Sequence, residues 1–124
     1  MADKADMLEK IFTLQRTFMD MLVEHDKFPE YPVDLTTKPG QRFFKETAFN
    51  MVEELMEASF TLKNRMHKLS EDSAVDWEHF REELADTFAY FVELMIIAGI
   101  SANDIYNEYV RKNFIVRERV KNGY

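Results

Sequence analysis

Residues 77–99 read WEHFREELADTFAYFVELMIIAG, and this stretch decides the fold class of the chain. Its large apolar side chains recur every three or four residues, namely Phe80, Leu84, Phe88, Phe91 and Met95. Such a period places them on one face of an α-helix. The spacing predicts a helix over 77–98, which Gly99 ends because helix termini favour glycine.

Two segments that precede this helix carry the same period. One runs from about Lys4 to His25, and its apolar stripe comprises Met7, Leu8, Ile11, Leu14, Phe18, Met21 and Leu22. The other runs from about Arg42 to Lys68, with Phe43, Ala48, Met51, Leu55, Ala58 and Leu62 on its apolar face. Both patterns predict amphipathic helices.

The remaining segments supply loops and one more helix. All three prolines fall in KFPEYPVDLTTKPG, residues 27–40, which predicts a loop. A connector follows the second helix, with Ser73 or Asp76 available to cap the third. Ser101 and Asp104 resemble a capping box for a fourth helix that reaches about Arg119. No segment alternates with period two, so we expect an all-α domain, with Phe43, Phe44 and the aromatic side chains of 77–98 in its core.

Length and composition exclude several classes of protein. A chain of 124 residues forms a single domain, 1–124, with one core. It has no cysteine, which excludes disulfides and thiolate metal sites. Neither a signal peptide nor an apolar run long enough to span a membrane is visible, so we expect a soluble cytoplasmic protein. The net charge of −7 argues against nucleic acid as a partner.

Two pairs of carboxylates are candidate metal ligands. Glu54 and Glu57 are three residues apart, and so are Glu83 and Asp86. On a helix this spacing puts both members of a pair on one face. Four oxygen donors from two neighbouring helices suit Mg²⁺.

Spacing alone does not establish this site. With 23 acidic residues in 124, chance predicts roughly four pairs of this kind, and the sequence has four. The two candidate pairs differ from the N-terminal ones because they lie inside the most hydrophobic helices. Carboxylates near a core need a cation when no lysine pairs with them. Glu53 with Glu57, four apart, is the alternative register for the first pair.

The acidic pairs and the C-terminal segment together resemble a known family. ExxE, a gap of 25 residues and ExxD resemble the metal signature of the all-α nucleoside triphosphate pyrophosphohydrolases, which include MazG and the dimeric dUTPases. The tail fits a segment typical of the dimeric dUTPases and related phage enzymes at Tyr109, Lys112, Asn113, Arg119, Gly123 and Tyr124. Leu14 and Gln15 resemble the start of that family's first helix. Val116 and Val120 depart from its pattern, and the short chain is similar to compact MazG-like and phage members.

The resemblance implies a fold and a reaction. The fold would be a four-to-five-helix bundle, assembled as a homodimer or as a dimer of dimers (a homotetramer). The reaction would convert a deoxynucleoside triphosphate to its monophosphate and pyrophosphate, with dUTP and dCTP, or dGTP and dATP, as substrates. Mg²⁺, for which Mn²⁺ can substitute, would be held by the catalytic residues Glu54, Glu57, Glu83 and Asp86. The substrate phosphates would contact Lys112, Asn113, Arg119 and Tyr124. Gln15 would lie on the side of the base.

Two other hypotheses follow from the residues alone. The chain could be a non-catalytic helical module that binds a nucleotide or a protein. The tail, residues 109–124, carries a net charge of +4, which leaves −11 on the preceding 108 residues. These cations could simply offset the macrodipole of the last helix. DNA binding through so short a patch is disfavoured on an acidic chain.

Overall fold

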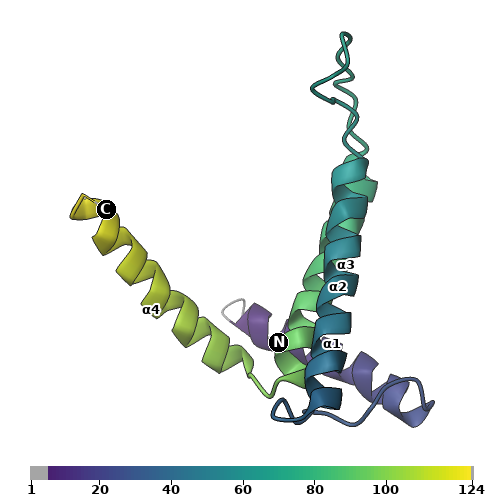
Figure 1. Cartoon of the computed structure of the whole chain (residues 1–124), viewed down its shortest axis with the longest axis vertical. Coiled ribbons are helices and arrows are strands. Elements are labelled where there is room, and N and C mark those ends of the chain that lie inside the picture. Colours follow the sequence, from purple (N-terminus) through teal and green to yellow (C-terminus); the bar gives the residue numbers. More distant parts are fainter. Residues whose placement is uncertain (1–5, 124) are drawn as a thin grey trace. The chain divides into compact units, whose positions relative to one another are not determined.

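A computed structural model describes residues 6–123 of the chain (Figure 1). It contains four helices, which are α1 (Met7–Glu24), α2 (Lys38–Phe60), α3 (Trp77–Ile97) and α4 (Ala102–Lys121). No strand occurs among the described residues. The predicted all-α fold class is therefore confirmed. None of these four helices is by itself both long and apolar enough to cross a membrane.

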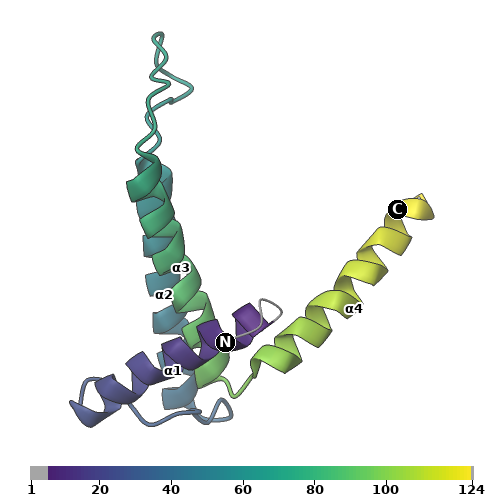
Figure 2. The same cartoon turned by 180° about the vertical axis from the view of Figure 1, so that it is seen from behind.

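The chain divides into two compact units. One comprises Met1–Pro32 with Met95–Tyr124, and the other comprises Val33–Leu94. In the first unit α1 and α4 contact each other. In the second, α2 and α3 lie side by side and run in opposite directions (Figures 1 and 2). The candidate metal ligands all belong to the second unit, whereas Gln15 and the tail belong to the first.

Helix α2 begins four residues before the predicted start at Arg42. Thr37 caps it, since the Thr37 side chain accepts a hydrogen bond from the Gly40 amide at 3.1 Å. Pro39 lies in the first turn. The N–H groups of the first turn have no acceptor within the helix, so the missing N–H of proline removes no helical hydrogen bond there. The prediction of a loop was therefore wrong for residues 38–40.

The same helix ends at Phe60, eight residues before the predicted end at Lys68. Side chains compete there for the last carbonyl groups. Thr61 Oγ1 donates to Ala58 O at 2.7 Å, and Lys63 Nζ donates to Phe60 O at 3.0 Å. These bonds satisfy carbonyls that lack a helical partner, so the backbone can leave the helix without a glycine or a proline. Residues 61–76 then form a long connector to α3.

Helices α3 and α4 begin and end close to where the sequence predicts. Asp76 caps α3, since its Oδ1 accepts from the His79 amide at 3.1 Å. Gly99 adopts φ +79° just after α3, a conformation that favours glycine. The predicted capping box is present, with the Asp104 amide donating to Ser101 Oγ and the Ser101 amide donating to Asp104 Oδ2, each at 3.0 Å.

Burial differs from the prediction. The apolar stripe predicted for the first helix is largely exposed, with Leu14 at 61% and Phe18 at 51%, whereas Phe12 and Met19 are fully buried. Phe88 and Phe91, predicted to lie in the core, are each 44% exposed. Phe43 and Phe44 are half-buried. Because each helix is apolar on more than one face, periodicity alone did not identify which face the chain itself covers.

Candidate metal centre between α2 and α3

Three glutamate side chains converge between α2 and α3. Glu54 and Glu57 lie one turn apart on α2, and Glu83 lies on the adjacent α3. One carboxylate oxygen from each lies within 4.8 Å of the other two. Oxygen atoms about 2.1 Å from a shared Mg²⁺ lie no more than roughly 4.2 Å apart, so small side-chain movements would let all three bind one ion.

The carboxylate of Glu83 has an unsatisfied oxygen. Its Oε2 is buried and has no hydrogen-bond donor among the described residues, and the Glu83 side chain is only 14% exposed. Its Oε1 lies 3.7 Å from His79 Nε2 on the preceding turn of α3. A buried carboxylate oxygen without a donor is costly. A divalent cation among the three glutamates would satisfy it, so the residues present fit such an ion.

The electrostatics of Glu54 support the same conclusion. Its pKa is raised to about 7, first by burial, then by a hydrogen bond that its protonated form can make with Glu83, and then by the negative charges of Glu57, Asp86 and Glu83. Two carboxyl groups can share a hydrogen bond only when one of them holds a proton. The site therefore favours bound positive charge, either as a proton or as a metal ion.

The other predicted ligands occupy less central positions. Asp86 is exposed and lies outside the group of three, although its charge contributes to the raised pKa of Glu54. Glu53, the alternative ligand, is also exposed and does not belong to the group. The structure thus brings together Glu54, Glu57 and Glu83.

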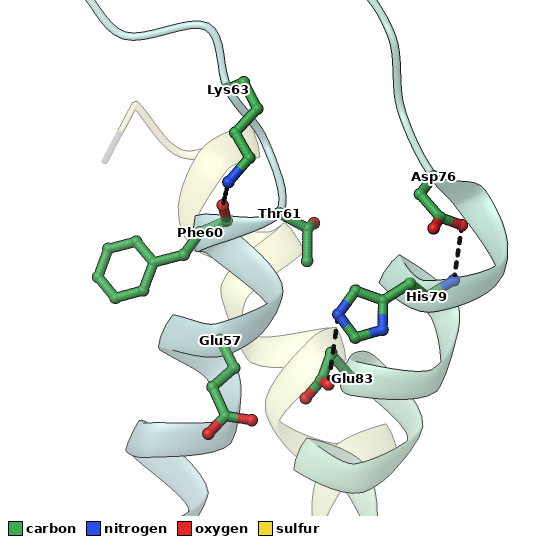
Figure 3. Close-up of a pocket in the computed structure, with 7 residues that line it drawn as sticks. All are labelled: Glu57, Phe60, Thr61, Lys63, Asp76, His79 and Glu83. Atoms are coloured by element: carbon green, nitrogen blue, oxygen red, sulfur yellow. Dashed lines mark hydrogen bonds and ion pairs between the residues drawn. The ribbon is translucent and has the colours of Figure 1, made fainter.

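A pocket opens beside this group at the C-terminal end of α2 (Figure 3). Its volume is about 460 Å³, and it is lined by Glu57, Phe60, Thr61, Lys63, Asp76, His79 and Glu83. His79 and Glu83 extend from α3 on the side that faces α2 (Figure 3). The sequence analysis did not assign Lys63 or His79 to the site. His79 precedes Glu83 by four residues, and this helical spacing was the available signal.

The tail residues and Gln15 lie in the first unit. Lys112, Asn113 and Arg119 are exposed on α4, and Gln15 is half-buried on α1. Two neighbouring cations of α4 are paired within the helix, Arg111 with Glu108 and Lys121 with Glu118. Tyr124 lies outside the described residues.

Comparison with known proteins identifies a family. A family model described as dUTPase matches residues 36–124, a range that contains α2, α3 and α4 together with Glu54, Glu57, Glu83 and Asp86. Gln15 lies outside the matched range. No curated protein and no solved structure gives a significant match.

Proposed function

The chain belongs to the dUTPase family, and from this premise we propose that it hydrolyses a deoxynucleoside triphosphate to the monophosphate and pyrophosphate with Mg²⁺. The family match by itself supports an activity of the dNTP pyrophosphatase type, and so a hydrolase that acts on nucleoside triphosphates. The observation that carries the finer proposal is the convergence of Glu54, Glu57 and Glu83 within 4.8 Å. The candidate substrates are either the pyrimidine nucleotides dUTP and dCTP or the purine nucleotides dGTP and dATP.

Each carboxylate has a distinct role in this proposal. Glu57 and Glu83 would hold the ion, and Asp86 would add negative charge or a further ligand. A bound Mg²⁺ supplies charge neutralisation at the phosphate oxygens. Glu54, the third member of the group, would accept a proton from the attacking water. The water oxygen forms a bond to phosphorus, the α–β anhydride bond breaks, and pyrophosphate leaves.

The tail would hold the outer phosphates in this proposal. Lys112 and Arg119 provide positive charge, and Asn113 provides a hydrogen-bonding amide. Tyr124 would close the pocket, and Gln15 would contact the base. These roles rest on the resemblance of the tail and of the first helix to the family. Arginine and lysine neutralise charge that develops on transferred phosphoryl groups, which is why such residues suit this task.

We also propose that the protein acts as a homodimer or homotetramer. Exposed apolar side chains support this. On α1 they recur at intervals of four and three residues, namely Met7, Ile11, Leu14, Phe18 and Met21. On α2, Phe49 and Phe60 are 64% and 55% exposed. Contiguous apolar surface of this kind marks association sites.

The direct test is release of pyrophosphate from dUTP, dCTP, dTTP, dATP and dGTP, each with Mg²⁺ and with EDTA. We expect metal-dependent release from at least one nucleotide and its loss in Glu57→Gln. Glu82→Gln is the matched control, because Glu82 is exposed and lies on α3 outside the group of three. Nucleotide binding without turnover, by folded protein that has bound Mg²⁺, would instead identify the non-catalytic module.

A further inference from the structure

The α3 face that carries the metal ligands continues past them. Glu83, Asp86, Tyr90 and Glu93 follow one another at intervals of three, four and three residues, so all four lie on one face of the helix. We call these four residues the polar seam. Glu93, at its far end, is only 5% exposed. For the part of the chain that the structure describes, burial is the cause that shifts the pKa of its carboxyl group.

Helix α2 runs alongside the seam (Figures 1 and 2). Because α2 and α3 are antiparallel, moving from Glu54 toward the N-terminus of α2 corresponds to moving from Asp86 toward the C-terminus of α3 (Figures 1 and 2). Two turns from Glu54 along α2 lies Thr47, a buried polar residue that is 4% exposed. From Asp86 to Glu93 the seven-residue rise is about 10 Å.

Tyr90 links the two ends of the seam electrostatically. Its pKa is raised first by burial and then by the negative charges of Glu93, Glu54 and Asp86, with a smaller effect from Glu53. Tyr90 thus lies in the field of the metal ligands and of Glu93 at the same time. Burial also raises the pKa of Glu93 to about 7. A buried carboxyl group is costly to ionise unless a hydrogen-bond donor stabilises it, and a ligand can supply that donor.

We propose that Glu93 is a specificity-determining residue that accepts hydrogen bonds from N–H groups on the substrate's base. This inference rests on the proposed function, because it needs the triphosphate to lie at Glu54, Glu57 and Glu83. A nucleotide whose phosphates are held there and which extends along the seam would bring its base to Glu93, because the rise to Glu93 is comparable with the reach from the α-phosphate through the deoxyribose to the base edge. Glu93 would then meet the base, with Tyr90 beside the sugar.

The chemistry of a carboxylate selects among bases. A glutamate accepts from the exocyclic amino group of cytosine, as it does in the readout of base edges in nucleic acids. Uracil offers one N–H between two carbonyl oxygens, and those oxygens repel a carboxylate. Glu93 should therefore favour a base that carries an amino group, and dCTP should be a better substrate than dUTP. Glutamine at this position has an N–H₂ group that would donate a hydrogen bond to a carbonyl oxygen of uracil.

The test compares wild type, Glu93→Gln and the control Glu82→Gln, all as the full chain with Mg²⁺. Two quantities are measured for dCTP and dUTP: kcat/KM, and the Kd of their non-hydrolysable α,β-imido analogues. We expect the dCTP-to-dUTP ratio to fall at least about tenfold in Glu93→Gln, a typical value for one good base contact. The ratio should not change in Glu82→Gln. Circular dichroism confirms that each variant is folded.

The two readouts separate this inference from the proposed function. Turnover with an unchanged dCTP-to-dUTP ratio in Glu93→Gln would overturn the role of Glu93 and leave the proposed function intact. If no nucleotide is hydrolysed but the ratio of analogue affinities shifts, the role of Glu93 stands and the hydrolase does not. If the folded wild-type protein binds neither analogue but hydrolyses dATP or dGTP, the role of Glu93 is overturned and the proposed function stands. Failure to bind the analogues together with no hydrolysis of any of the five nucleotides would overturn both.

Discussion

Nε2 of His79 lies 3.7 Å from Oε1 of Glu83 (Figure 3), while the other oxygen of Glu83 is buried without a hydrogen-bond donor in the part of the chain that the structure describes. His79 is itself held at the start of α3, because its amide donates to Asp76 Oδ1 at 3.1 Å. One side of the Glu83 carboxylate is therefore beside a histidine on a fixed helix end. The second oxygen, Oε2, is the one that a cation would contact. Substitution of Glu83 therefore tests metal binding most directly.

Glu83→Gln should separate stability from metal binding. Removal of a buried charge that lacks a partner should raise the free energy of unfolding of the metal-free protein by about 1 kcal/mol, or a few degrees in Tm. The variant should also lose the stabilisation that Mg²⁺ gives to the wild type. Thermal unfolding with EDTA and with Mg²⁺ measures both effects.

Glu82→Gln is the control for that experiment, since it removes the same charge one residue away from an exposed position. It should leave both the metal-free Tm and the Mg²⁺ effect close to wild type. Equal Mg²⁺ stabilisation of Glu83→Gln and wild type would mean that the metal, if bound, lies elsewhere.

The metal-free protein should become less stable as pH rises. The pKa values of Glu54 and Glu93 are each raised from 4.5 to about 7 in the folded state. Between these values the folded state binds more protons than the unfolded state, so the free energy of unfolding falls as pH increases. The stabilisation from both groups is complete below about pH 4.5 and is lost as pH rises through about 7. Tm in EDTA should therefore fall from about pH 5 to about pH 8.

Glu93→Gln should make this fall smaller, because one of the two titrating groups is removed and Glu54 remains. The same pH series, recorded by circular dichroism for both proteins, gives the comparison. Identical slopes for the variant and the wild type would show that Glu93 keeps an ordinary pKa in the folded protein.

Gly40→Ala should destabilise the start of α2. A Cβ on Gly40 would lie 2.0 Å from Asp34 O, an atom that also accepts hydrogen bonds from the Thr37 amide at 3.2 Å and from Thr37 Oγ1 at 2.8 Å. The backbone of Asp34 would have to move and would weaken the cap. We expect a loss of about 2–4 kcal/mol in the free energy of unfolding, measured by urea denaturation.

Gly123→Ala provides the comparison for that loss. Gly123 has φ +78°, but no atom of the other described residues, its chain neighbour aside, lies within 4 Å of the position that a Cβ would take. Its substitution should therefore cost only the conformational strain, about 1 kcal/mol. A smaller loss for Gly40→Ala than for Gly123→Ala would exclude the steric clash as the dominant effect.

Periodicity was sufficient to predict that four helices exist, but it did not fix where α2 ends or which faces are buried. The end at Phe60 depends on hydrogen bonds from Thr61 and Lys63 side chains to carbonyls, and these leave no apolar signal in the sequence. The stripe that includes Leu14 and Phe18 has the spacing of a buried face yet is half or more exposed. The spacing of an apolar stripe does not show whether the same chain or another molecule covers it.

The candidate site shows a similar division. Spacing alone placed Glu54 and Glu57 on one helix face, and the resemblance of the acidic pairs to a known signature singled them out among equally spaced ones. Neither the spacing nor the resemblance could show that one oxygen of Glu83 is buried without a hydrogen-bond donor among the described residues, because that depends on the packing of α2 against α3. The sequence also did not predict a role for Glu93, because a glutamate inside a long apolar run only indicates that the run is interrupted. Only its burial reveals the seam.

Lys112→Ala tests whether the tail contributes to the proposed site. If Lys112 holds a substrate phosphate, its removal should raise KM for the deoxynucleoside triphosphate about tenfold, as expected for loss of one charge-assisted contact of about 1.5 kcal/mol. Lys121→Ala is the matched control, because Lys121 lies on the same helix and is paired with Glu118 at 3.5 Å. Steady-state kinetics with Mg²⁺ measures both variants. A tenfold rise in both would indicate a general electrostatic effect of α4, since the two lysines share only their charge and their helix. A rise in neither would exclude a direct contact of Lys112 with the phosphates, and a rise for Lys112→Ala alone would support it.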